Sequence, residues 1–216
     1  MELITSLNLK NSEYFSKNRF ISYYNQLRLL FSLGKQVKNV LEIGIFNSLF
    51  TDILKRNDYN VTTADVDPRL NPDIILDLTQ DFTLPQDTFD VIILFQVLEH
   101  LPYEQSELAL QKLAVATKKF LLISIPYNTE YLALQVKPSF LNRPRHLFIN
   151  VPKFWTKIPL CNQHYWEIGL KGYPKQRFLN SVAKAGLTVK REFIDPSNPY
   201  HYFLILQKNS VFNNVS

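Results

Sequence analysis

Cysteine and long apolar runs are scarce in this chain of 216 residues. Its single cysteine, Cys161, excludes an intramolecular disulfide framework and a zinc site made of four thiolates. Apolar runs such as 91–95 and 120–125 are far shorter than the roughly 20 residues of a membrane-spanning helix, and no basic segment precedes an apolar one at the start. We therefore expect a cytoplasmic protein without disulfides, a secretory signal or a membrane span.

A strong excess of one charge sign is also lacking. The chain has 24 lysine and arginine residues against 19 acidic residues, a net charge of +5, and the basic residues are scattered. This distribution argues against a nucleic-acid partner. Hydrophobic residues make up 46% and charged residues 20%, which excludes a disordered chain and predicts a packed globular domain. The oligomeric state is left open.

Short apolar runs alternate with segments of helical periodicity over most of the chain. Strands are expected at 39–44, 60–65, 73–77, 89–95, 119–125, 187–193 and 201–207, and helices at 12–33, 48–56, 104–116 and 175–184. Near-continuous apolar strands separated by helices indicate a parallel sheet covered on both faces. The predicted fold is α/β, a doubly wound, Rossmann-like, seven-stranded, mostly parallel sheet with helices on both faces.

The same pattern sets the expected domain boundaries. Residues 1–38 form an N-terminal helical cap, 39–208 the α/β domain, and 209–216 a tail. Residues 127–174, which follow the fifth strand, are rich in proline and aromatic residues and interrupt the alternation. A long irregular insertion of this kind is typical of a lid or binding loop.

Glycine is scarce where a phosphate-binding loop would need it. The turn after the first strand, 42–48, holds one glycine, Gly44, whereas a pyrophosphate loop needs several to let backbone amides approach. Glu42 just before it favours a cationic or zwitterionic ligand, although a capping or loop-ordering acid is an equal alternative. Asp65 ends the second strand, 23 positions later, and suits a ligand with ribose hydroxyls.

An ordered set of motifs carries a family resemblance. The strings VLEIG (40–44), ADVDP (64–68), LDL (76–78), FDVIILFQVLEHL (89–101) and FLLISIPY (120–127) end successive strands. In this order and spacing they resemble class I S-adenosylmethionine-dependent methyltransferases of the small-molecule group. The resemblance implies that 39–208 is a methyltransferase domain, with S-adenosylmethionine as cofactor and S-adenosylhomocysteine as product.

The resemblance also implies roles for individual residues around that cofactor. Glu42 and Gly44 would lie beside the methionine moiety, Asp65 would bind the ribose hydroxyls and Val66 would flank the adenine. Asp77 and Leu78 would hold the adenine edge and face, and Gln96 would close the site near the methionine amino group.

The first loop departs from the family pattern. Phe46 and Ser48 occupy positions where the family has glycines in its E-x-G-x-G loop. A positive φ at a bulky residue such as Phe46 would be strained. This departure favours the alternative function, a non-catalytic interaction protein with a degenerate cofactor loop.

Candidates for the acceptor side come from two segments. His100 follows the fourth strand near the expected methyl position and titrates in the range of a general base, although a loop-ordering role is the alternative. His164 and Glu167 lie in the insertion among aromatic residues, which suit a small hydroxylated or amine-bearing metabolite, including a sugar-containing one. Methyl transfer from a sulfonium needs no metal in principle, and we assign no metal ligand from the sequence.

Overall fold

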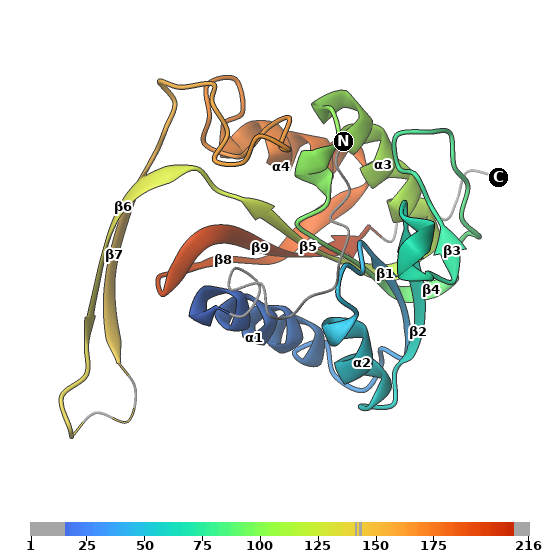
Figure 1. Cartoon of the computed structure of the whole chain (residues 1–216), viewed down its shortest axis with the longest axis horizontal. Coiled ribbons are helices and arrows are strands. Elements are labelled where there is room, and N and C mark those ends of the chain that lie inside the picture. The colour runs from blue at the N-terminus through green and yellow to red at the C-terminus, as the bar shows by residue number, and fades with distance from the viewer. Residues whose placement is uncertain (1–15, 141, 143, 210–216) are drawn as a thin grey trace.

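The computed structural model describes residues 16–140, 142 and 144–209 (Figure 1). The central elements in chain order are α1 (Lys17–Phe31), β1 (Asn39–Ile43), α2 (Leu49–Lys55), β2 (Asn60–Asp65), the 3-10 helix η1 (Pro68–Leu70), β3 (Ile74–Ile75), β4 (Phe89–Phe95), the 3-10 helix η2 (Leu98–His100), α3 (Tyr103–Ala116) and β5 (Thr117–Pro126). They are followed by β6 (Thr129–Val136), β7 (Arg145–Pro152), α4 (Lys175–Lys184), β8 (Leu187–Asp195) and β9 (Asn198–Lys208).

One sheet of seven strands organises the molecule, in the order β3-β2-β1-β4-β5-β9-β8. Strands β1 to β5 pair in parallel, and β9 lies antiparallel between β5 and β8. The predicted mostly parallel, Rossmann-like sheet is therefore confirmed. The strand order reverses between β1 and β4, and open α/β sheets bind ligands outside the carboxyl ends of the strands at such a point.

Helices cover both faces of the sheet, as expected. Figure 1 shows α1 and α2 on one face and α3 and α4 on the other. Alternate residues of β1 point into the two layers: Leu41 packs in one apolar core with Leu110 of α3, and Val40 in the other with Leu30 of α1. Both layers are thereby anchored to the same central strands.

Helix α1 closes one of these layers. Its N-cap is Ser16, whose Oγ accepts a hydrogen bond from the backbone N–H of Arg19 at 3.3 Å. Ser22 on its buried face lies 2.8 Å from Nδ1 of His201 on β9, which ties the helix to the sheet. The rest of the predicted N-terminal cap, 1–15, and residues 210–216 of the tail lie outside the described residues. None of the described helices is long and apolar enough to cross a membrane.

The insertion 127–174 differs from the irregular segment expected from the sequence. It contains an antiparallel hairpin, in which β6 and β7 pair from Thr129 with Pro152 to Val136 with Arg145. The hairpin projects away from the sheet (Figure 1). The chain leaves and re-enters the domain at one place, because Tyr127 bridges Ile168 and the N–H of Asn128 donates to the carbonyl of Ile168 at 2.8 Å.

Candidate active site

The turn after β1 depends on a single glycine. Gly44 has φ +85°, and a Cβ added there would lie 2.6 Å from Cγ2 of Val97, which follows β4. A side chain at this position would therefore be strained and would overlap its neighbour. Because Gly44 has no side chain, the loops after β1 and β4 can come into close contact at the point where the strand order reverses.

Two residues of this turn hold the left-handed backbone that glycine usually provides. Phe46 has φ 42° and Ser48, the residue before α2, has φ 55°. A left-handed conformation costs a residue other than glycine about 1–2 kcal/mol. The loop therefore keeps a glycine-like path with larger residues. The strain expected at Phe46 is present, and its side chain is 38% exposed.

Asp65 joins this turn to the loop after β2. Its Oδ2 accepts the N–H of Ile45 and its Oδ1 accepts the N–H of Asp67, both at 3.0 Å. A carboxylate has about four lone-pair positions, so each oxygen retains capacity for one more donor. Asp67 itself is paired with Arg69, with Oδ2 2.7 Å from Nη2. In the loop after β2, Asp65 therefore has lone pairs that can accept a hydrogen bond from a ligand hydroxyl, whereas Asp67 is paired with Arg69.

Glu42 belongs to β1, two residues before Gly44. It is 5% exposed, and its Oε2 accepts the hydroxyl hydrogen of Thr51 at 2.7 Å. Burial raises the pKa of Glu42 to about 7, against weaker opposing effects of the Thr51 hydrogen bond and Lys55. The bond to α2 fits the loop-ordering alternative. Its place near the carboxyl end of β1, two residues before Gly44, fits the ligand-binding alternative.

The other predicted cofactor residues lie along the same edge. Asp77 Oδ1 accepts both the N–H and the hydroxyl of Thr79, at 2.8 and 2.7 Å. Leu78 is buried, whereas Val66 is 48% exposed. Gln96 follows β4 with φ 59°, and its Nε2 donates to Oγ of Ser124 on β5 at 3.2 Å.

The predicted acceptor-side residues form a second group just beyond β4. The rings of His100 and His164 are 4.8 Å apart, centroid to centroid, and Nδ1 of His164 lies 2.7 Å from Oε1 of Glu167. His100 is exposed at its outer side, yet desolvation of its ring and then the neighbouring His164 lower its pKa. Its imidazole is therefore neutral at pH 7, the form that accepts a proton.

Glu167 is fully buried, which sequence reasoning did not anticipate. Its Oε1 also accepts the N–H of Leu160 at 3.0 Å, and its Oε2 accepts Nδ2 of Asn128 at 2.8 Å. Glu167 thus ties His164 and Leu160 to Asn128 at the start of the insertion, an arrangement that favours a positioning role over contact with a substrate.

Glu99 is the residue of this group that sequence reasoning missed. It is 0% exposed, and neither of its carboxylate oxygens has a hydrogen-bond partner within the described part of the chain. Burial, and less so the charge of Glu167, raise the pKa of Glu99 well above its usual range. An acid next to His100 in an otherwise apolar run was the available signal, but only the fold shows that it is buried.

Comparison with known proteins gives the family. A family model described as a methyltransferase domain matches residues 15–167. No curated protein sequence matches the chain.

Several solved structures share the fold. The N-methyltransferase NodS from Bradyrhizobium japonicum WM9, in complex with S-adenosyl-l-homocysteine, has a TM-score of 0.58 and 17% identity over 89% of this chain and 88% of its own. Magnesium protoporphyrin IX methyltransferase (ChlM) from Synechocystis PCC 6803, with bound SAM, has a TM-score of 0.57 and 13% identity over 89% and 80%. A Burkholderia thailandensis 1,6-didemethyltoxoflavin-N1-methyltransferase has a TM-score of 0.52 and 12% identity over 88% and 86%.

The family match spans β1 to the end of the acceptor-side group, and therefore includes the loop of Gly44, Asp65 and Gln96. The strand order and the motifs at the strand ends agree with it. The chain belongs to the methyltransferase-domain family.

Proposed function

We propose that this protein transfers a methyl group from S-adenosylmethionine to a small hydroxylated or amine-bearing metabolite. The observation that carries the proposal is Asp65, whose carboxylate ties together the loops after β1 and β2 and keeps capacity for further donors. A ribose presents two neighbouring hydroxyls that such a carboxylate can accept.

The residues at this edge fit the cofactor. Gly44 leaves the turn without a side chain, Asp65 accepts the ribose hydroxyls, and Asp77 with Leu78 borders the adenine. The bound cofactor supplies an electrophilic methyl on a sulfonium. Glu42 and Gln96 border the methionine end, and a positively charged ligand there would favour the ionised form of Glu42.

The acceptor side supports a small metabolite. Neutral His100 can take a proton from an acceptor hydroxyl or amine held against the methyl. The fold relatives NodS and the toxoflavin enzyme are named as N-methyltransferases. The basic residues are scattered along the sequence, which argues against a nucleic-acid acceptor.

Phe46 supports the second candidate, a non-catalytic protein of the same fold. Its ring stands at a family glycine position. At Phe46 the backbone has a φ of 42° and so keeps the conformation of a glycine-containing cofactor loop. The phenylalanine side chain, however, is larger than the glycine it replaces and would stand beside the cofactor. The two candidates differ in whether the cofactor binds.

Calorimetric titration of the purified chain with S-adenosylmethionine, S-adenosylhomocysteine and, as a control, NAD tests the proposal. We expect micromolar binding of the two sulfur compounds and none of NAD. Asp65→Asn should raise the dissociation constant by about tenfold or more, because a charge-assisted hydrogen bond contributes about 1.5–3 kcal/mol. The matched control is Asp58→Asn, an exposed acid in the loop before β2. No binding by the wild type would support the non-catalytic candidate, and equal affinities of both variants would refute the ribose role of Asp65.

A further inference from the structure

Three metal-ligand side chains from two distant segments meet beyond the carboxyl end of β4. Glu99 and His100 come from η2, and His164 comes from the returning part of the insertion. One ligand atom of each residue lies within 4.8 Å of one from each of the other two. Two imidazoles and a carboxylate form a donor set that first-row transition metals accept, often with positions left open.

Both histidines are oriented as metal ligands usually are. Nδ1 of His164 donates to the carboxylate of Glu167 at 2.7 Å, and Nδ1 of His100 donates to the carbonyl of Gln163 at 3.3 Å. These acceptors fix the tautomer of each ring, so that Nε2 carries the free lone pair. A carboxylate or carbonyl behind the ring is the common outer-shell partner of a metal-bound histidine.

Glu99 provides an independent observation. Its carboxylate is fully buried and, among the described residues, neither oxygen has a partner. A buried carboxylate without hydrogen bonds is costly, and such groups are normally paired or coordinate a metal. A cation between Glu99 and the two histidines would satisfy it.

We propose that Glu99, His100 and His164 bind one divalent first-row transition-metal ion, and that its open positions hold an oxygen of the methyl acceptor. The site lies at the same sheet edge as Gly44, since Val97, two residues before Glu99, meets Gly44 directly. The metal site stands on these contacts alone, whereas its role in catalysis rests on the proposed function.

The role follows from metal chemistry. A divalent ion lowers the pKa of a bound hydroxyl and so exposes a lone pair on its oxygen. That lone pair forms the bond to the methyl carbon, and the carbon–sulfur bond breaks with its electrons passing to sulfur. The hydroxyl proton passes to solvent water, because Nε2 of His100 is then a metal ligand and the base role of His100 applies only to the metal-free site. A hydroxylated acceptor is thereby favoured over an amine.

Metal titration of the full chain tests the site. We expect the chelator-treated protein to bind one Co²⁺, followed by the visible absorption of the ion, and to bind Zn²⁺ by calorimetry. Glu99→Gln and His164→Ala should each weaken binding by about a hundredfold or more, since even an outer-shell partner commonly contributes about 10–100-fold. His146→Ala is the matched control, because His146 lies on the exposed hairpin. Should Glu99→Gln fail to fold, His100→Ala at the outer side of the site carries the same test.

Glu167→Gln tests the positioning role. It should weaken Co²⁺ binding by about 10–100-fold and alter the absorption spectrum, a change that a purely structural role would not produce. Absence of binding by the wild type, or equal affinity of the ligand variants and His146→Ala, would overturn the metal site.

The metal titration and the cofactor titration test the two proposals independently. Metal titration is done without S-adenosylmethionine, and cofactor titration is done on the metal-free chain. Metal binding without cofactor binding would leave the site standing and refute the proposed function, and the reverse result would refute the site alone.

Discussion

The two edges of the central sheet use polar residues in opposite ways. At the amino edge, polar groups link neighbouring strands by forming hydrogen bonds and ion pairs with one another. At the carboxyl edge, Glu42 and Glu99 are buried with raised pKa values. Positive φ angles occur at both edges: at Gly44, Phe46, Ser48 and Gln96 after β1 and β4, and at Asp58 and Asp87 before β2 and β4. The same strands therefore carry a closed end and an end that is left ready for ligands.

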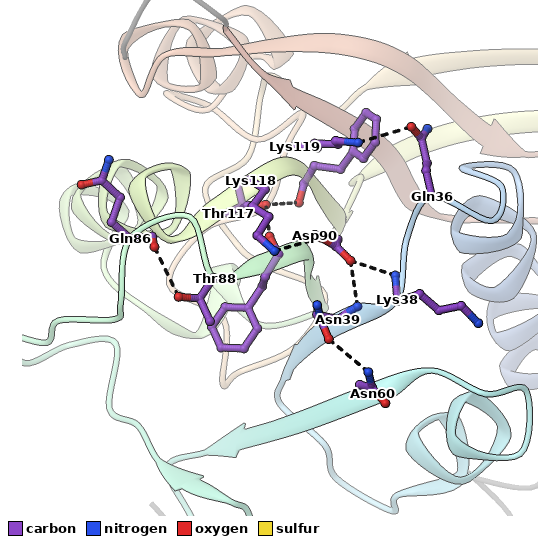
Figure 2. A network of polar contacts seen from close by, with 12 residues as sticks. Gln36, Lys38, Asn39, Asn60, Gln86, Thr88, Asp90, Thr117, Lys118 and Lys119 are labelled. Carbon is purple, nitrogen blue, oxygen red and sulfur yellow. Dashed lines mark hydrogen bonds and ion pairs between the residues drawn. The ribbon is translucent and has the colours of Figure 1, made fainter. Parts of the chain in front are cut away.

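Asp90 at the start of β4 organises the amino edge. Its Oδ2 accepts the N–H groups of Lys38 and Asn39, both at 2.9 Å, and its Oδ1 lies 3.3 Å from Nζ of Lys118 (Figure 2). Asn60 of β2 extends this network by donating to Asn39 at 3.2 Å. Neighbouring strands β2, β1, β4 and β5 are thus joined by side chains as well as by the sheet.

The amino ends of these strands therefore contribute mainly to stability, and their carboxyl ends mainly to function. A buried polar group without a hydrogen-bond partner is unusual and is often retained for a functional reason, and Glu99 at the carboxyl edge is such a group among the described residues. Substitutions at the two edges should accordingly have different consequences.

The largest effect is expected for Gly44→Ala. The new Cβ would adopt a left-handed backbone and overlap Val97, so we expect a loss of about 3 kcal/mol in unfolding free energy. Gly34→Ala is the matched control, because it has φ +77° but nothing within 4 Å of the added Cβ, and it should cost about 1 kcal/mol. Denaturant unfolding measures both. Equal costs at the two glycines would show that the contact with Val97 is unimportant.

Glu42→Gln should change how stability depends on pH. The folded pKa of about 7 lies above the unfolded value of 4.5, so the wild type loses stability as pH rises from about 4.5 to 7. A shift of this size corresponds to about 3 kcal/mol. The groups that face Glu42 are Thr51, Lys55 and Asp52, and all remain in the variant. The difference in unfolding free energy between the two proteins should therefore grow across this window. A constant difference would argue that Glu42 is ionised when buried.

Asp90→Ala should lower the unfolding free energy by about 2 kcal/mol, since it removes an acceptor for two backbone N–H groups. Its affinity for S-adenosylmethionine should be unchanged, because the site lies at the other edge. Asp81→Ala is the control: its ion pair with Lys112 is exposed to solvent, and its removal should leave the unfolding free energy essentially unchanged. A loss of cofactor affinity in Asp90→Ala without unfolding would break the separation of the two edges.

The smallest effect is expected for Phe46→Gly and Ser48→Gly. Ser48→Gly should raise the unfolding free energy by about 0.5–1 kcal/mol, since relief of the left-handed strain exceeds the entropy that glycine adds to the unfolded chain. Phe46→Gly should gain less, because it also removes a side chain that is only 38% exposed. Thermal unfolding measures the shift. Destabilisation by Ser48→Gly, whose side chain makes no cap hydrogen bond, would mean that the loop is not strained.

The sheet was predictable because its central strands are apolar on both faces and appear in the sequence as short apolar runs. Its helices are apolar on one face and show helical periodicity. The hairpin of β6 and β7 was not, because most of both its faces are exposed. Residues such as Tyr131, Leu132 and Leu134 point to solvent on either side and give no period-two pattern. The prolines near its tip, Pro138 and Pro144, further suggested an irregular segment.

The site was predictable only as far as strand ends could place it. Asp65 and Gly44 follow β2 and β1, so topology alone brings them to one edge. His164 and Glu167 approach His100 through a long-range return of the chain, which no local pattern encodes. The burial of Glu99 likewise depends on the layers packed around it.

The bridge between Tyr127 and Ile168, together with the bonds of Glu167 to Asn128 and Leu160, makes the segment between them a closed loop. Loop-closure entropy grows slowly, by about 0.6 kcal/mol for each doubling of length. Residues 129–159 can therefore be shortened, lengthened or exchanged between relatives at little cost to the domain. The hairpin can therefore vary while the sheet and its carboxyl edge stay fixed.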